Sequence, residues 1–378
     1  MKKLADRLTG AAVLAFMGVM LLLTLFHRKE TYSESEGRAL AGFPTLFSQE
    51  EGTFTDRLTL YAADHFVGRS GWTAMKARLD SAVCESISEG VYIDKSRLLE
   101  TMITERGDMS PAAEAVNSFA KSYGGAVYFA AIPTSSGVYS ELLPQYLMSV
   151  TEKQLIDGFY GSLSGDIRKI DAYNILKMLS DNYIYYRTDP RWTSYGAYAV
   201  YRTVIQKLGF QPSKFDKYTI EHLTDSFRGS LFRRSQYMLC KPDIIDIYQY
   251  SGGAEVTQCL SISSDGTGES LPFYNMEALE SADMYGVYPG AEVPFLRIET
   301  SVNNERRLLV IKDQLANCLL PFLTQHYSRI DVIAPELLEG AVTDYIDPSD
   351  YEQTLMIFGI DSLDNSEVFN KLNSGKEN

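Results

Sequence analysis

The feature that most constrains this fold is a set of four short, mainly apolar runs at residues 126–132, 308–311, 330–333 and 354–358. Such runs are typical of strands that are buried on both faces of a sheet. Helical patterns separate them: residues 111–121, 151–163 and 172–179 surround the first run, and residues 315–325 separate the second from the third. This alternation predicts an α/β fold, doubly wound around a mainly parallel sheet.

Residues 210–299 have a different sequence pattern from the rest of the chain. They contain short alternating stretches such as residues 244–250, several glycines and no long helical period. We interpret this region as an insertion of short strands and loops. Before the core, residues 54–87 have helical spacing with a break near Gly68 and Gly71, which fits either a helical hairpin or one broken helix.

The N-terminus is predicted to cross a membrane. Lys2, Lys3 and Arg7 precede an uncharged run from Leu8 to Phe26, and about 20 apolar residues are needed to span a bilayer. A cleaved signal peptide is the alternative, but no small-residue cleavage site follows Phe26, which favours an uncleaved signal anchor. We therefore expect a cytoplasmic tail at residues 1–9, an anchor at 10–26, a linker at 27–50, a helical region at 51–90 and an external domain at 91–375.

The charge balance excludes nucleic acid as a partner. The whole chain carries a formal charge of −14, and its first 30 residues hold five Lys or Arg against two Asp or Glu, which leaves −17 on the remainder. A strongly acidic external region repels polyanions. Neutral or cationic groups, such as sugars or other proteins, are the expected partners.

The cysteines indicate no metal or cofactor site. Cys84, Cys240, Cys259 and Cys318 are scattered without a CxxC pair, so we predict neither metal nor cofactor and interpret all four as mostly buried thiols. A bridge between Cys240 and Cys259 is the less favoured alternative.

A polar loop precedes the helical pattern at residues 199–208. It reads Asp189-Pro190-Arg191-Trp192, and Thr193 or Ser194 is placed to cap the following helix. Proline removes a backbone donor and holds Asp189 in extended geometry. Such a loop presents polar side chains.

Two further polar segments follow predicted strands. Asp313, Gln314 and Asn317 come after residues 308–311, and Thr134 and Ser135 come after residues 126–132. Ligands of doubly wound sheets bind beyond the carboxyl ends of the strands. These side chains are therefore predicted to lie at one edge of the sheet.

In this order and spacing, the motifs resemble those of the bacterial DHHW-type proteins, which are similar to SGNH hydrolases and to alginate O-acetylation proteins. The resemblance covers nearly all of the external region and implies a three-layer SGNH-hydrolase-like fold. The motifs that carry it are Glu36-Gly37-Arg38, Asp64-His65-Phe66 with Arg69, Thr188-Asp189-Pro190-Arg191-Trp192, Ser194-Tyr195-Gly196-Ala197-Tyr198, Phe227-Arg228-Gly229-Ser230-Leu231, Ile311-Lys312-Asp313-Gln314, Asn317 and Pro321-Phe322-Leu323.

The family pattern implies a Ser-His-Asp triad, from which this chain departs twice. Asp189 is kept, but Arg191 stands at the histidine position and Gln314 at the serine position. Arginine stays protonated and cannot act as a general base, and glutamine offers no nucleophilic hydroxyl. Of the four histidines, His65, His222 and His326 are weighed as substitutes, and structural roles are favoured.

Three hypotheses for the function follow. The favoured one is a catalytically degenerate accessory or binding protein of cell-surface polysaccharide O-acetylation, with a glycan and a membrane-bound O-acyltransferase as the partners that the resemblance implies. Asp313, Gln314, Asn317, Thr134 and Ser135 would line its pocket, and Trp192 or Tyr195 would stack on a sugar unless Trp192 is core. The alternatives are an active acetyltransferase or acetylesterase with a noncanonical site, and a structural cell-envelope protein.

Overall fold

A computed structural model describes residues 2–27, 29–33, 36, 38–45, 53–82, 87–94, 96–101, 107–147 and 150–373. The chain forms two compact units. The first comprises residues 1–88 and 233–238, and the second comprises residues 89–232 and 239–378.

The first unit is mainly helical. Its long helix α1 (Lys2–Phe26) contains an 18-residue segment, Arg7–Thr24, that is long and apolar enough to span a membrane and has no part buried. Two further helices, α2 (Phe54–Asp64) and α3 (Arg69–Ala82), are separate, so the break predicted near Gly68 divides two helices. The short strands are β1 (Tyr32–Ser33), β2 (Arg38–Ala39) and β3 (Ile87–Ser88).

The second unit is built around one eight-stranded sheet. Its strands follow the order β11-β10-β12-β14-β13-β15-β6-β7, and the five from β14 to β7 are parallel. The bounds of these parallel strands are β6 (Ala126–Ile132), β7 (Arg168–Ile170), β13 (Arg307–Lys312), β14 (Arg329–Ile333) and β15 (Gln353–Gly359). All four apolar runs predicted as strands are strands of this parallel part.

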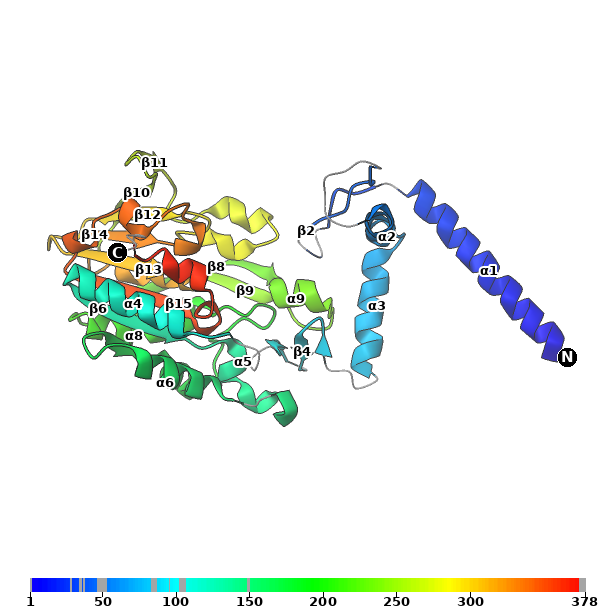
Figure 1. The fold of residues 1–378 in the computed structure, drawn as a ribbon, viewed down its shortest axis with the longest axis horizontal. Coiled ribbons are helices and arrows are strands. Elements are labelled where there is room, and N and C mark those ends of the chain that lie inside the picture. The colour runs from blue at the N-terminus through cyan, green and yellow to red at the C-terminus, as the bar shows by residue number, and fades with distance from the viewer. Residues whose placement is uncertain are drawn as a thin grey trace. The chain divides into compact units, whose positions relative to one another are not determined.

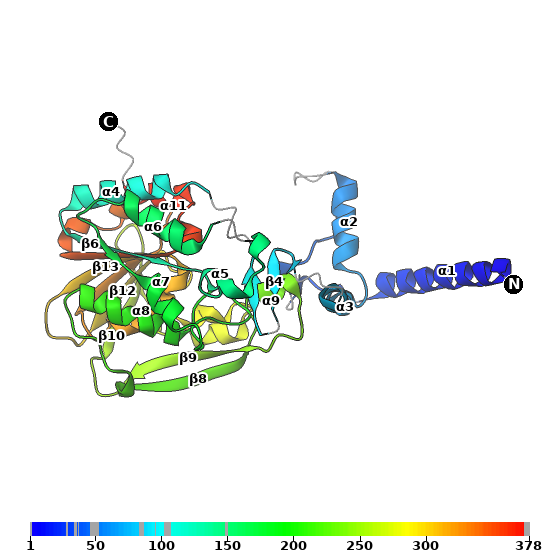
Figure 2. The ribbon, with the colours of Figure 1, turned by 90° about the horizontal axis from the view of Figure 1, so that it is seen from below.

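Helices cover both faces of the sheet, which gives three layers (Figures 1 and 2). One face packs against α4 (Ser110–Tyr123), α6 (Glu152–Ser162) and α11 (Ser366–Asn370), and the other against α7 (Ala172–Met178) and α8 (Ser194–Lys207). Successive strand residues alternate between the two cores: Tyr128 and Ala130 of β6 face α7 and α8, whereas Val127 and Phe129 face α4 and α6. This alternation explains why the runs are apolar throughout.

The remaining elements of the second unit are short. The strands are β4 (Val91–Ile93), β5 (Leu98–Glu100), β8 (Tyr218–Phe227), β9 (Asp243–Tyr250), β10 (Val256–Ile262), β11 (Gly268–Ser270) and β12 (Phe295–Thr300). The helices are α5 (Ser135–Val138) and α10 (Leu320–Leu323), and α9 (Ser230–Ser235) crosses the boundary between the units. Single 3-10 turns connect many of them.

Residues 210–299 form short strands and loops, as the insertion was expected to do. Within them, β10, β11 and β12 extend the central sheet through antiparallel pairing, and β8 and β9 form a ribbon of their own. One sequence-based expectation needs correction. The helix expected at residues 315–325 is a 3-10 segment, η7 (Gln314–Leu319), followed by the one-turn helix α10. Pro321 supplies no backbone donor, which limits a regular helix there.

Three of the four cysteines lie among the described residues. Cys240, Cys259 and Cys318 are free and buried, so the alternative of a bridge between Cys240 and Cys259 is wrong for this structure. Cys84 and Gly37 lie outside the described residues.

Candidate functional site

The loop from Tyr185 to Thr193 closes on itself and is fixed at both ends. Tyr185 and Trp192 form an antiparallel bridge, and the amide of Thr193 donates to the carbonyl of Ile184 over 2.9 Å. Thr193 then caps α8 by accepting a hydrogen bond from the amide of Gly196. The turn at residues 188–191 is thereby held in one position.

Asp189 lies at the centre of this turn and is completely buried. Arg191 donates to it from Nε over 2.6 Å and from Nη2 over 3.0 Å, and the amide of Ser230 donates over 3.0 Å. A Cβ at Gly229 would lie 2.2 Å from the Cβ of Asp189, so only glycine permits this approach. The Phe227–Leu231 motif therefore serves to enclose Asp189.

Arg191 also reaches a second carboxylate. Its Nη1 and Nη2 donate to Asp283 over 3.0 and 2.7 Å, and the guanidinium lies over the ring of Tyr285 at 4.1 Å from the centroid. Burial alone would raise the pKa of Asp189, but the charge and hydrogen bonds of Arg191 outweigh it and lower that pKa. Asp189 and Arg191 are thus a charged pair that has no free proton acceptor facing a ligand.

Asp313 begins the segment after β13 and caps η7 through the amide of Leu315. Its other oxygen accepts from the amide of Gly359 over 2.7 Å and from the hydroxyl of Ser362 over 2.8 Å. Burial, together with the nearby charge of Asp361, raises the pKa of Asp313 to about 6. Asp313 therefore joins the carboxyl ends of β13 and β15 and titrates near neutral pH.

Gln314 stands between two pockets. We call them the edge pocket, of about 300 Å³, and the middle pocket, of about 280 Å³; both are also lined by Arg191. Within the described part of the chain, the Gln314 side chain makes no hydrogen bond. The edge pocket is lined by Thr134, Pro190, Arg191, Asp313, Gln314, Leu315, Glu336, Asp361 and Ser362. The middle pocket is lined by Arg191, Asn275, Glu277, Ala278, Ser281, Asp283, Tyr285, Gly286, Ala291, Glu292, Gln314 and Asn317.

The structure thus brings most of the predicted site residues together. The edge pocket collects residues that follow β6, β13, β14 and β15, which is the carboxyl edge that the strand pattern predicted. Asn317 lines the middle pocket and accepts a hydrogen bond from the buried ammonium of Lys312. Burial lowers the pKa of Lys312 to about 8.

Four residues that were predicted to bind a ligand have side chains that are buried, packed elsewhere or already hydrogen-bonded. Trp192 is completely buried and donates from its indole to the carbonyl of Leu315 over 2.7 Å, which matches the core alternative. Tyr195 packs edge-on against Phe215 and lines neither pocket. Thr134 lines the edge pocket, but its hydroxyl donates to Glu152 over 2.6 Å, and its neighbour Ser135 is buried.

The four histidines, all of which are described, line neither of these pockets. His326 is buried against Tyr201, and burial lowers its pKa to about 4. His222 is exposed on β8 and contacts Asp246 at 2.5 Å. His65 bonds to the carbonyl of Ala41, and His27 is exposed after α1. Neither His222 nor His326, the two histidines of the second unit, lines a pocket beside Gln314.

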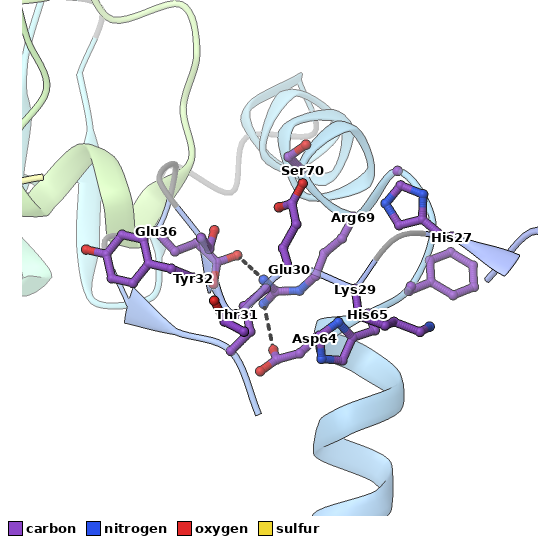
Figure 3. Close-up of a pocket in the computed structure, with 14 residues that line it drawn as sticks. His27, Lys29, Glu30, Thr31, Tyr32, Glu36, Asp64, His65, Arg69 and Ser70 are labelled. Carbon is purple, nitrogen blue, oxygen red and sulfur yellow. Dashed lines mark ion pairs between the residues drawn. The ribbon is translucent and has the colours of Figure 1, made fainter. Parts of the chain in front are cut away.

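A separate pocket of about 980 Å³ lies within the first unit (Figure 3). Arg69 contacts Glu36 at 2.5 Å and Asp64 at 3.6 Å, as the dashed lines in Figure 3 show. Arg38 contacts the same two carboxylates at 2.9 and 2.5 Å. These four charges satisfy one another and tie β2 to α2 and α3, which gives the early family motifs a structural role.

Sequence reasoning missed two carboxylates that shape the site. Asp283 holds Arg191 from 92 residues away, and buried Asp243 accepts from the amide of Thr188 over 2.8 Å and from its hydroxyl over 2.5 Å. No local motif marks either residue, because their partners are distant in the chain.

The second unit has a three-layer α/β fold of the SGNH-hydrolase-like kind, with a polar pocket at the carboxyl edge of its parallel strands. The family model described as "DHHW protein" matches residues 107–333, and this chain belongs to that family. A comparison with curated proteins finds no match.

Two solved structures, the first two named here, share the fold. A DHHW family protein from Eubacterium siraeum is 20% identical, with a TM-score of 0.63, and the match covers 76% of this chain and 98% of that one. PatB1 from Bacillus cereus is 22% identical, with a TM-score of 0.57, covering 72% and 96%. The O-acetyltransferase domain of Pseudomonas putida AlgJ is 13% identical, with a TM-score of 0.43, covering 76% and 94%.

Proposed function

We propose that this DHHW protein is a non-catalytic component of cell-surface polysaccharide O-acetylation, anchored by residues 10–26 and carrying its second unit outside the membrane. It binds a glycan and acts beside a membrane-bound O-acyltransferase. The O-acetylation context comes from the family resemblance, and the absence of triad chemistry is argued from the site.

The arrangement of Arg191 carries this proposal. At the position of the family's histidine, a guanidinium is held by Asp189 and Asp283 and remains charged. Beside it, the amide of Gln314 replaces a nucleophilic hydroxyl. The loss of one triad member removes about 10⁴-fold or more of the rate in serine proteases, and two are replaced here.

A second candidate function rests on Ser362. Its hydroxyl donates to Asp313 over 2.8 Å in the edge pocket, and the pKa of that carboxyl is raised to about 6 by burial and by Asp361. A serine that donates to such a carboxylate is the start of a nucleophile and general-base pair. This candidate is an acetylesterase or acetyltransferase that bypasses the family triad.

Hydrolysis of an acetyl ester by the full chain in detergent separates the two candidates. We expect no turnover above that of a heat-denatured sample, and none in Gln314→Ala or Ser362→Ala. Turnover that Ser362→Ala abolishes and Gln314→Ala leaves intact would establish the second candidate. Turnover that Gln314→Ala abolishes would refute the proposal of a degenerate triad.

The reciprocal experiment restores the family residues. Because Asp189 is already in place and buried, Arg191→His combined with Gln314→Ser is expected to give measurable ester hydrolysis, whereas each single change gives none. Activity in either single variant would contradict the roles assigned to these two positions.

A further inference from the structure

A third pocket continues the row formed by the edge and middle pockets. We call it the aromatic pocket; it has a volume of about 520 Å³ and shares Asn275, Glu277, Gly286 and Ala291 with the middle pocket. The middle pocket in turn shares Arg191 and Gln314 with the edge pocket. The three pockets therefore adjoin one another in a row. The two replaced triad positions, Arg191 and Gln314, lie where the edge pocket meets the middle pocket.

The dimensions of this row suit an elongated ligand. Pockets that hold a drug-sized molecule measure roughly 300–1,000 Å³. The edge pocket, at about 300 Å³, lies at the lower limit of that range, and the middle pocket, at about 280 Å³, lies just below it. Three small adjoining pockets fit the successive residues of a chain better than they fit one compact molecule. An oligosaccharide has this shape.

The aromatic pocket offers a surface for the apolar face of a sugar ring. Phe273 and Tyr274 are partly exposed, and their ring centroids are 4.9 Å apart at an interplanar angle of 73°. Leu271, Met276 and Val293 complete an apolar wall. Aromatic side chains supply large contact areas with one polar tip, and sugars present apolar C–H faces between their hydroxyl edges.

Carboxylates give the row its charge. Glu277 and Glu292 line the middle pocket, are exposed, and make no ion pair within the described residues. Arg191, the cation of the middle and edge pockets, is already paired with Asp189 and Asp283. Glu336 and Asp361 add negative charge in the edge pocket. A carboxylated ligand is repelled by this lining, and an ammonium group is attracted.

We infer that the three pockets form a binding track for a polysaccharide of hexosamines whose amino groups are free. Phe273 and Tyr274 hold the sugar rings, and Glu277 and Glu292 pair with the ammonium groups. The inference rests on the proposed glycan-binding function and adds the chemical class of the glycan, from which polyuronates are excluded.

Isothermal titration calorimetry of the full chain in detergent at pH 6 tests the inference with three tetrasaccharides. They are tetraglucosamine, tetra-N-acetylglucosamine and a tetrauronate, which carry positive, zero and negative charge. We expect tetraglucosamine to bind about tenfold more tightly than the acetylated tetramer, which corresponds to about 1.4 kcal/mol. No binding of the tetrauronate is expected.

Matched variants assign the two roles. Glu277→Gln with Glu292→Gln should reduce the preference for tetraglucosamine to less than about threefold and leave the affinity for the acetylated tetramer unchanged. Phe273→Ala should weaken both ligands about tenfold. The controls are Glu114→Gln with Glu367→Gln, two exposed carboxylates outside the row, and Tyr146→Ala, an exposed ring outside it. Neither control should change binding.

The outcomes distinguish a failure of the amino-glycan assignment from a failure of the proposed glycan-binding function. Equal affinities for the charged and acetylated tetramers, or tighter binding of the tetrauronate, overturn the amino-glycan assignment while glycan binding stands. Failure of all three ligands to bind overturns both the track and the glycan-binding part of the proposed function. Ester hydrolysis is a different measurement and decides the non-catalytic part independently.

Discussion

At the scale of single residues, Arg191 makes a buried aspartate tolerable. Asp189 has no exposed surface, and its side-chain partners are the Arg191 guanidinium and two backbone amides. A buried charge that loses its partner is strongly destabilising, whereas the removal of both partners costs much less. The pair therefore contributes to folding through mutual compensation.

This compensation gives a first prediction. Arg191→Met should lower the free energy of unfolding by about 3–5 kcal/mol, because Asp189 is left charged and buried. Urea denaturation of the full chain in detergent measures the change. Asp189→Asn combined with Arg191→Met should recover most of the loss, and a double variant as unstable as the single one would contradict the argument.

A second residue-scale prediction concerns pH. The folded-state pKa of Asp313 is raised from 3.8 to about 6, so the folded protein binds more protons than the unfolded chain between these values. The free energy of unfolding should therefore fall by about 2–3 kcal/mol from this group as pH rises from 4 to 6. Relative to wild type, Asp313→Asn should gain stability over that interval.

Urea midpoints at half-unit pH steps test this dependence. Asp347→Asn is the control, because Asp347 is exposed and hydrogen bonds to Ser349 lower its pKa below the interval. If the difference in urea midpoint between wild type and Asp313→Asn stays constant from pH 4 to 6, the Asp313 carboxyl does not take up a proton on folding.

The candidate site was predictable at the residue scale where local motifs exist. Asp189, Arg191, Asp313 and Gln314 each lie in a short motif at the end of a predicted strand or the start of a helix. Asp283 was not predictable, because its pairing with Arg191 spans 92 residues and depends on how residues 276–288 fold over the site.

At the scale of elements, α8 is positioned by a close contact at its first turn. A Cβ at Gly196 would lie 2.3 Å from the carbonyl oxygen of Ile184, in the loop that carries Asp189. Helix and loop are therefore in direct backbone contact, and the glycine fixes the distance between them.

Gly196→Ala should accordingly destabilise the fold by about 1–3 kcal/mol, because backbone atoms must move apart. Gly158→Ala in α6 is the matched control: nothing lies within 4 Å of the added Cβ, and a stabilisation of about 0.5–1 kcal/mol is expected. Thermal or urea unfolding compares the two, and equal effects would rule out the contact as the cause.

Elements with a strong period were predicted well, and elements set by tertiary pairing were not. The apolar runs of β6, β13 and β15 are buried on both faces. Their apolar pattern therefore indicates a strand whichever neighbouring strands they pair with. By contrast, β10 and β12 mix polar and apolar residues without a regular period, and only their pairing with each other and with β14 places them in the central sheet. Their sequences do not encode that register locally.

At the scale of the whole molecule, the proposed anchor in α1 predicts where the protein resides. With its anchor in place, the full chain should stay in the membrane pellet after alkaline carbonate extraction, because an 18-residue apolar span is held by the hydrophobic effect. Deletion of residues 1–27 should release the protein into the soluble fraction. Release of the full chain by carbonate alone would exclude an anchor.

The link between Arg191 and Asp283 has a consequence for the history of the protein. Under the proposed loss of the triad, a change at Arg191 or at Gln314 alone restores no activity on which selection could act. The change at Arg191 also removes a guanidinium that two carboxylates share. Under this proposal the two positions are epistatic, and a return to the triad that begins at Arg191 passes through a less stable protein.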